Sequence, residues 1–278
     1  MGNTTRIEWT DSTWNPIRGC SRVSEGCRNC YAEAIAARFS KTGQAYEGLA
    51  TLKGLDARWT GEVRLIETHL EDPIRWRKPR KIFVNSMSDL FHPGVKDEWL
   101  TEIFSVMARA PRHIYQILTK RPERMLEALT AGAESVAAAL FTNTFGQPWP
   151  PLNWWFGVSV EDHETATHRL PILAKCPAFV RFVSYEPALG PVHWESALTL
   201  QEQRSAISWI IAGGESGTNA RRMHPDWARS ARQFCNDNHI AFFFKQWGEF
   251  HPNEIAKVGK KKAGSVLDGV EWRDFPPC

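Results

Sequence analysis

Three cysteines stand close together near the N-terminus, and their spacing is typical of a metal site. Cys20, Cys27 and Cys30 follow the pattern C-x6-C-x2-C, with a glycine shortly before each of the first two. Three thiolates on one short loop can surround one soft metal centre. A [4Fe–4S] cluster that is held entirely by protein takes four ligands. Three cysteines therefore predict a [4Fe–4S] cluster with one open iron, which could bind a substrate or a cofactor.

Zinc is the main competing interpretation of this loop. A closed structural zinc site needs a fourth ligand, and the nearest histidine candidate, His69, is far downstream. Three buried cysteines without metal are the remaining alternative, although glycines and polar loop residues make poor core material. Cys176, Cys235 and Cys278 are scattered along the chain, and we interpret them as ordinary core or surface thiols.

Short apolar runs recur along the chain, each followed by a polar loop and a helix-like segment. Near-continuous apolar runs are typical of parallel strands that are buried on both faces. The clearest runs are residues 81–85, 113–118, 154–158, 180–183, 208–212 and 241–244, and further strands are expected before the cysteines and at 62–66. Helices are expected at 31–39, 97–110, 122–139, 162–174 and 226–238, and loops or insertions at 41–61 and 143–153.

This alternation predicts the α/β class, with repeated βαβ units. We expect a full or partial TIM-like (β/α)6-8 barrel with parallel strands, and a doubly wound open sheet is the alternative. Residues 1–250 would form a single barrel domain that carries the cysteine loop near its N-terminus. Residues 251–278 would form a C-terminal extension that packs on the barrel through Leu267 and Trp272.

Polar residues directly follow six of the expected strands, at the end where α/β barrels carry their chemistry. A charged residue in that place is costly unless it is paired or functional. Any one of them could be a helix cap or part of a salt bridge, but together they predict a polar basin. The pair Gly213-Gly214 indicates that the backbone approaches another group closely. The basin residues are Asn85, Ser86, Ser88, Asp89, Thr119, Lys120, Arg121, Ser159, Glu161, Asp162, Ser184, Glu186, Glu215, Ser216, Lys245 and Gln246.

The amino-acid composition is that of an ordinary globular protein. The chain has 278 residues, 42% hydrophobic content and a net charge of +3. Such a mildly basic balance neither requires nor excludes nucleic acid. We recognise no signal peptide and no apolar run long enough to span a membrane, so we expect a cytoplasmic protein that does not contact a membrane.

The cysteine loop and the strand ends together resemble a phage and bacterial family of unknown function that has a three-cysteine signature. The resemblance covers nearly the whole chain. The segments that carry it are residues 14–20, 27–33, 83–92, 118–122, 157–161, 184–187, 213–217 and 244–248. That family looks like a divergent branch of the radical S-adenosylmethionine enzymes. The larger group has C-x3-C-x2-C on the loop after the first barrel strand, and this chain departs from it with six residues in the first gap.

The resemblance implies a cofactor and a set of site residues. S-adenosylmethionine would chelate the open iron, an external electron donor would reduce the cluster, and the sulfonium would then be cleaved. Lys120 would neutralise the carboxylate of the cofactor, Glu161 and Asp89 would accept from its ribose, and Glu215 or Glu186 would lie near its sulfonium. Our predicted catalytic residues are Lys120, Glu186 and Lys245. Our predicted cofactor-binding residues are Asn85, Ser88, Asp89, Ser159, Glu161 and Glu215.

Three functions from different classes follow from these observations. The first is a radical S-adenosylmethionine-like enzyme, whose substrate could be a nucleic-acid base. The second is a non-catalytic zinc or iron–sulfur protein that binds nucleic acid through the basic run 75–81 or works with a partner protein. The third is a hydrolase or nuclease that binds a divalent metal through Asp89, Glu161, Glu186 and Glu215, which leaves the cysteine loop unexplained.

Overall fold

The computed structural model describes residues 5–54, 56–130, 149–253 and 255–277. The chain divides into two compact units. Unit 1 comprises residues 1–156 and 176–179, and unit 2 comprises residues 157–175 and 180–278. Within the described residues, no helix is both long enough and apolar enough to cross a membrane.

The main sheet has seven strands in the order β1-β6-β7-β8-β9-β10-β11. Both the β1–β6–β7 pairs and the β9–β10–β11 pairs are parallel. This parallel, nearly sequential order is that of a partial TIM-like barrel, so the predicted fold class is confirmed. The strands are β1 (Ser12–Trp14), β6 (Lys81–Val84), β7 (Ile114–Thr119), β8 (Trp154–Ser159), β9 (Val180–Tyr185), β10 (Trp209–Gly213) and β11 (Ala241–Gln246). The six clearest apolar runs of the sequence are thus confirmed as strands, to within two residues at each end.

Unit 1 builds its core from aromatic side chains beside β6 and β7. Trp9 packs against Phe83 with ring centroids 4.7 Å apart, and Trp14 lies 6.3 Å from Tyr115. Helix α4 (Asp97–Arg109) buries an apolar stripe that includes Phe104, as its periodicity predicts. The other helices of unit 1 are α1 (Tyr31–Arg38), α2 (Glu67–Leu70), α3 (Asp72–Arg75) and α5 (Pro122–Thr130), with the 3₁₀ turn η1 (Glu25–Cys27). The helix expected at 122–139 is described only as far as Thr130, and residues 131–148 lie outside the described part.

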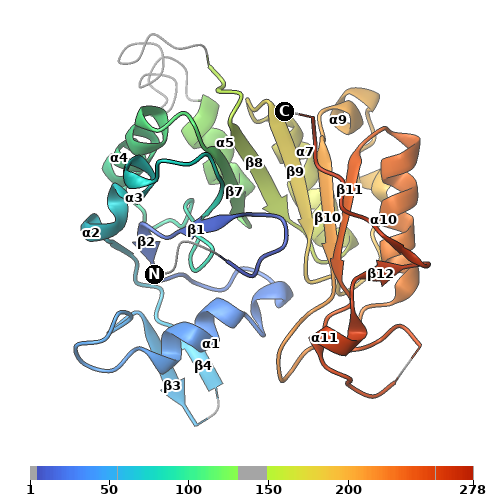
Figure 1. Cartoon of the computed structure of the whole chain (residues 1–278), viewed down its shortest axis with the longest axis horizontal. Coiled ribbons are helices and arrows are strands. Elements are labelled where there is room, and N and C mark those ends of the chain that lie inside the picture. The colour runs from blue at the N-terminus through green and yellow to red at the C-terminus, as the bar shows by residue number, and fades with distance from the viewer. Residues whose placement is uncertain (1–4, 55, 131–148, 254, 278) are drawn as a thin grey trace. The chain divides into compact units, whose positions relative to one another are not determined.

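Two segments of unit 1 differ in detail from the expectation. The segment 41–61, for which a loop or an insertion is expected, contains the antiparallel hairpin of β3 (Ala50–Lys53) and β4 (Asp56–Trp59), which lies beside α1 (Figure 1). A small separate core explains the hairpin, because Tyr46, Leu49 and Ala50 pack on the alanines of α1. The strand expected at 62–66 is short β5 (Arg64–Leu65). It pairs antiparallel with β2 (Ile17–Arg18), outside the main sheet.

Unit 2 centres on Trp209 of β10. Its ring lies between 5.1 and 6.1 Å from the rings of Phe182, Phe243 and Phe275. Helix α10 (Pro225–Asp237) packs against β10 and β11 (Figure 1). The chain then returns over β11, where the Phe244 amide donates to the carbonyl of Trp272. The remaining elements are α7 (His163–Lys175), α8 (Trp194–Ala197), α9 (Gln201–Ser205), α11 (Lys260–Ala263), β12 (Val266–Leu267) and β13 (Val270–Glu271).

The close backbone approach that Gly213-Gly214 indicates is confirmed. A Cβ on Gly214 would lie 2.1 Å from the carbonyl oxygen of Trp247, and one on Gly213 would lie 2.8 Å from Glu186 Oε1. The first neighbour is backbone and cannot rotate away, whereas the second is the end of a side chain. A side chain should therefore be tolerated better at position 213 than at position 214.

We expect Gly214→Ala to destabilise the protein more than Gly213→Ala. Overpacking against fixed backbone should cost about 3 kcal/mol, and a clash that a carboxylate can relieve should cost about 1 kcal/mol. Urea denaturation of the two variants and the wild type measures the difference. Equal losses of unfolding free energy in the two variants would show that the backbone at Trp247 can move to relieve the clash.

A second prediction concerns pH and the buried His113. This imidazole is fully buried, and its Nε2 lies 2.9 Å from the carbonyl oxygen of Pro73. Burial lowers the pKa of His113. The unfolded chain therefore binds a proton more readily than the folded protein, so stability should fall as the pH drops below about 6.5.

The contribution of this imidazole can be isolated by substitution. We expect His113→Gln to reduce the slope of unfolding free energy against pH between pH 7 and pH 5, by at most about 1.4 kcal/mol per pH unit for one proton. Urea denaturation at several pH values checks this. Parallel curves for the variant and the wild type would show that His113 does not carry the pH dependence.

Candidate functional site

The three cysteines lie on the loop between β2 and α1, all within unit 1. Cys20 follows β2, Cys27 ends η1, and Cys30 caps the N-terminus of α1. Two tight turns compact the loop, because the Cys27 amide donates to Ser24 and the Cys30 amide donates to Cys27. All three are free thiols with partly exposed side chains.

The thiols share one electrostatic environment. The pKa of Cys20 is raised to about 12, mainly by burial of the sulfur and then by the nearby Asp89 carboxylate, Cys30 and Cys27. Burial also raises the pKa of Cys30, and the charge of Cys27 adds to the effect. Thiolates at Cys27 and Cys30 therefore disfavour ionisation of Cys20 unless a cation lies among them.

A buried ion pair fixes the start of the cysteine loop. Arg121 Nη1 donates to Asp89 Oδ2 at 2.8 Å, and Arg121 Nη2 donates to the carbonyl and the hydroxyl of Ser21, each at 2.9 Å. The side chains of Arg121 and Asp89 are only 11% and 8% exposed. The guanidinium also lies close enough to Cys20 to lower the pKa of that thiol. Arg121 therefore joins the end of β7 to the residue that follows Cys20.

His92 completes this network. Its Nδ1 accepts from the Gly94 amide at 3.1 Å, so its Nε2 carries the proton and donates to Ser21 Oγ at 2.8 Å. Burial and the charge of Arg121 both lower the pKa of His92, which favours this neutral form. Arg121 belongs to the predicted polar basin but has no predicted role there, and His92 is not among the predicted functional residues. The signal for Arg121 is the polar run that follows β7, in which Lys120 is the predicted cation.

Asp89 uses its whole hydrogen-bonding capacity inside the protein. Its Oδ1 accepts from Thr119 Oγ1 at 2.7 Å and from the Phe91 amide at 3.0 Å. Its Oδ2 accepts from Arg121 and from the Lys120 amide at 3.3 Å. A carboxylate offers about four lone-pair sites, so the geometry favours an anchoring role for Asp89 over the predicted contact with a ribose.

The other predicted residues of unit 1 also hold the loop. Ser88 Oγ donates to the Ile17 carbonyl at 2.9 Å, and Ser88 forms an isolated parallel bridge with Gly19. Asn85 adopts a left-handed conformation at φ 58°, and its Oδ1 accepts from the Ile17 amide. Its buried Nδ2 has no hydrogen-bond partner among the described residues. Gly19 must be glycine, since a Cβ there would lie 2.0 Å from the Glu62 carbonyl oxygen.

The far end of the loop is held by a second ion pair. Arg22 binds the buried carboxylate of Glu33 on α1 through two of its nitrogens, and Glu33 also accepts from the Trp59 amide at 2.8 Å. The hairpin, α1 and the cysteine loop are thereby joined within unit 1. Sequence reasoning did not identify Glu33, because a lone acid in a helix gives no indication that it is buried.

The predicted site residues of unit 2 are engaged in ion pairs. Buried Arg169 donates to Glu161 at 3.1 Å and to the Ser159 carbonyl at 2.7 Å. Glu215 receives a bidentate contact from Arg221, at 2.7 and 2.9 Å. Glu186 Oε1 lies 2.9 Å from Lys245 Nζ, and Ser184 Oγ donates to Glu186 Oε2 at 3.3 Å. Of the predicted catalytic residues, the structure therefore brings Glu186 and Lys245 together, and it places Lys120 beside Asp89.

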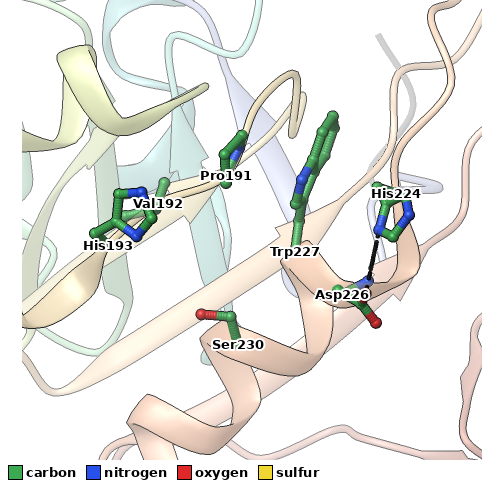
Figure 2. Close-up of a pocket in the computed structure, with 7 residues that line it drawn as sticks. All are labelled: Pro191, Val192, His193, His224, Asp226, Trp227 and Ser230. Carbon is green, nitrogen blue, oxygen red and sulfur yellow. Dashed lines mark hydrogen bonds and ion pairs between the residues drawn. The ribbon is translucent and has the colours of Figure 1, made fainter.

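A pocket of about 400 Å³ also lies in unit 2, and Figure 2 shows its lining side chains. His224 caps α10 there, with its Nδ1 accepting from the Asp226 amide at 3.2 Å. None of the predicted site residues lines it. The lining residues are Pro191, Val192, His193, His224, Asp226, Trp227 and Ser230.

One family model matches nearly the whole chain. A family model described as a protein of unknown function, DUF5131, matches residues 4–276. This chain belongs to the DUF5131 family. No curated protein and no solved structure matches it. Across the described residues of this DUF5131 protein, no three His, Cys, Asp or Glu side chains are already arranged to hold a metal ion.

We expect Asp89→Asn to destabilise the protein by about 3–5 kcal/mol. The amide can still accept from Thr119, but Arg121 is left as a buried charge without a carboxylate. Urea denaturation measures the loss. The exposed pair of Arg109 and Glu71, also at 2.8 Å, provides the control, because Glu71→Gln should cost less than about 1 kcal/mol. Similar small losses in both variants would contradict the anchoring role.

Proposed function

We propose that this DUF5131 protein is a radical S-adenosylmethionine-like iron–sulfur enzyme, with a [4Fe–4S] cluster on Cys20, Cys27 and Cys30. The observation that carries the proposal is the placement of three free thiols on one compact loop between β2 and α1, where Cys27 and Cys30 raise the pKa of Cys20 and Cys27 raises the pKa of Cys30. Such mutual repulsion is relieved when thiolates bind a metal centre. Metal sites of this kind are often completed only on binding, when the thiols lose their protons and converge on the metal.

The donor set fits an iron–sulfur cluster better than the alternatives. Three soft thiolates on one short loop match a cluster with one open iron. A structural zinc ion would need a fourth protein ligand. The carboxylates that a divalent-metal hydrolase would use are already paired with Arg121, Arg169, Lys245 and Arg221. When bound, a cluster of this type supplies one-electron chemistry and an open coordination position for S-adenosylmethionine.

The residues around the loop would position and protect the cluster. Arg121 would offset part of the negative charge of the Cys20 thiolate while Asp89 holds the guanidinium in place. Lys120, which precedes Arg121, remains our candidate for the carboxylate of S-adenosylmethionine. Glu33 and Arg22 would hold the loop against α1, so that Cys30 keeps its place at the N-terminus of the helix.

For the substrate we propose a nucleic-acid base. The exposed side chains of Arg75, Arg77 and Lys78 in unit 1 would contact phosphates. In unit 2, the partly buried pair of Glu186 and Lys245 is the candidate for proton transfer, because a carboxylate and an ammonium at 2.9 Å can exchange a proton with a bound group.

Anaerobic reconstitution with iron and sulfide tests the cluster. We expect a brown protein with roughly four irons and four sulfides per chain. Cys27→Ser should lose the colour and most of the iron, since two thiolates hold a cluster poorly. Cys176→Ser, which alters a buried cysteine outside the loop, is the matched control and should retain both. After reduction, the electron paramagnetic resonance spectrum should change on addition of S-adenosylmethionine.

Two other outcomes would be decisive. Zinc without sulfide would overturn the iron–sulfur proposal and favour the metal-bearing nucleic-acid-binding protein. If the cluster forms but its spectrum does not change on addition of S-adenosylmethionine, the iron–sulfur proposal would stand and S-adenosylmethionine would be excluded as the cofactor.

A further inference from the structure

Helix α1 turns its large apolar side chains outward and its small ones inward. Ala32, Ala36 and Ala37 are at most 5% exposed, whereas Tyr31 and Ile35 are 50% and 37% exposed. Phe39, the C-terminal cap residue, is 50% exposed. Residues four apart lie on the same side of a helix. A helix of a globular protein normally buries its larger apolar residues, so α1 is apolar on both sides.

This outward side, which we call the α1 face, comprises Tyr31, Ile35 and Phe39. Exposed apolar residues also occur on the neighbouring elements, at Val23 of the cysteine loop and Leu52 of β3. Unit 1 has seven large apolar side chains that are more than a third exposed among its described residues, and these five are the majority of them. A concentration of this kind marks an interaction surface.

The net exposed charge at the C-terminal end of the α1 face is basic. Between residues 28 and 41, the exposed charged side chains are Arg28, Arg38 and Lys41, and because Arg28 is paired with the exposed Glu25 at 3.6 Å, Arg38 and Lys41 form the basic border. The single acid in that stretch, Glu33, is buried and bound by Arg22. An apolar stripe with a basic border is complementary to an apolar surface with an acidic border.

We propose that the α1 face docks a partner protein that presents apolar side chains bordered by carboxylates. A second copy of this chain fits poorly, because a two-fold interface would place the basic border against itself. A membrane surface also fits poorly, because α1 has eight residues and is about 12 Å long, shorter than the helices that lie in lipid interfaces. This inference does not depend on the cluster.

A partner bound to the α1 face would also affect the cysteine loop. Helix α1 begins directly after Cys30, and Tyr31 Oη donates to the Ser86 carbonyl at 2.5 Å. A partner on the face therefore covers the helix that carries the third cysteine and a residue that contacts the end of β6. Such a partner would shield that side of the cysteine loop from solvent.

Two labelled peptides test the charge and the surface together. One is an amphipathic helix of leucines and glutamates, and the other has the same leucines with lysines in place of glutamates. We expect fluorescence anisotropy to show that the full-length protein binds only the acidic peptide, more weakly at high salt. Ile35→Glu should weaken this binding at least about tenfold. Leu200→Glu, at a leucine that is 51% exposed in unit 2, should leave it unchanged.

Further measurements keep the test independent of a folding defect. Thermal unfolding of Ile35→Glu checks the fold, and the double variant Arg38→Glu, Lys41→Glu should lose binding without any change to the apolar stripe. Hydrogen exchange should slow in residues 31–39 when the acidic peptide is added. Equal binding of both peptides, or no effect of Ile35→Glu, would overturn the proposal.

Binding of a different partner to the α1 face would give different experimental results. Sedimentation that shows a dimer dissociated by Ile35→Glu would assign the face to a second copy. Tighter binding of anionic vesicles or single-stranded DNA than of the acidic peptide, again lost in Ile35→Glu, would assign it to lipid or nucleic acid. Each of these results would overturn docking of an acidic protein.

Discussion

The cysteine loop depends on the buried ion pair between Asp89 and Arg121. A loop of glycines and polar residues cannot hold itself in place by packing, since it has little apolar surface to bury. The pair solves this problem by linking the end of β6 and the end of β7 to Ser21, directly after Cys20. Removing either partner would leave an uncompensated charge. Asp89 also receives four hydrogen bonds, which leaves little freedom for the carboxylate to move.

The two members of this pair act in opposite directions on the Cys20 thiol. Asp89 raises the pKa of Cys20 and Arg121 lowers it, while burial dominates both and keeps the thiol protonated. A metal that displaces the protons would exchange one positive charge for another within a fixed framework.

The sheet could be predicted from sequence because burial on both faces leaves a strong pattern. Runs such as 241–244 are apolar at every position, and only a parallel strand covered on both sides makes that pattern common. The hairpin of β3 and β4 could not be predicted in this way. Its small core relies on Tyr46 and Leu49 packing against alanines of α1, and alanines give a weak apolar signal. Local periodicity cannot reveal which distant segment supplies the other half of a core.

The candidate site was predictable as a set of residue types but not as a set of partners. Sequence reasoning identified Asp89, Glu161, Glu186 and Glu215 as acids at strand ends, where a carboxylate must be paired or functional. The structure pairs each of them with a cation, and those cations stand 32, 8, 59 and 6 residues further along the chain. No spacing rule connects such pairs, because the fold brings the partners together. An acid at a strand end therefore indicates a neighbouring cation as strongly as it indicates a ligand. Of the four acids, Glu186 has the most exposed side chain, at 13%, and it is the only one that is paired with a lysine rather than an arginine. Arginine does not deprotonate in proteins, so this pair suits proton transfer better than the other three.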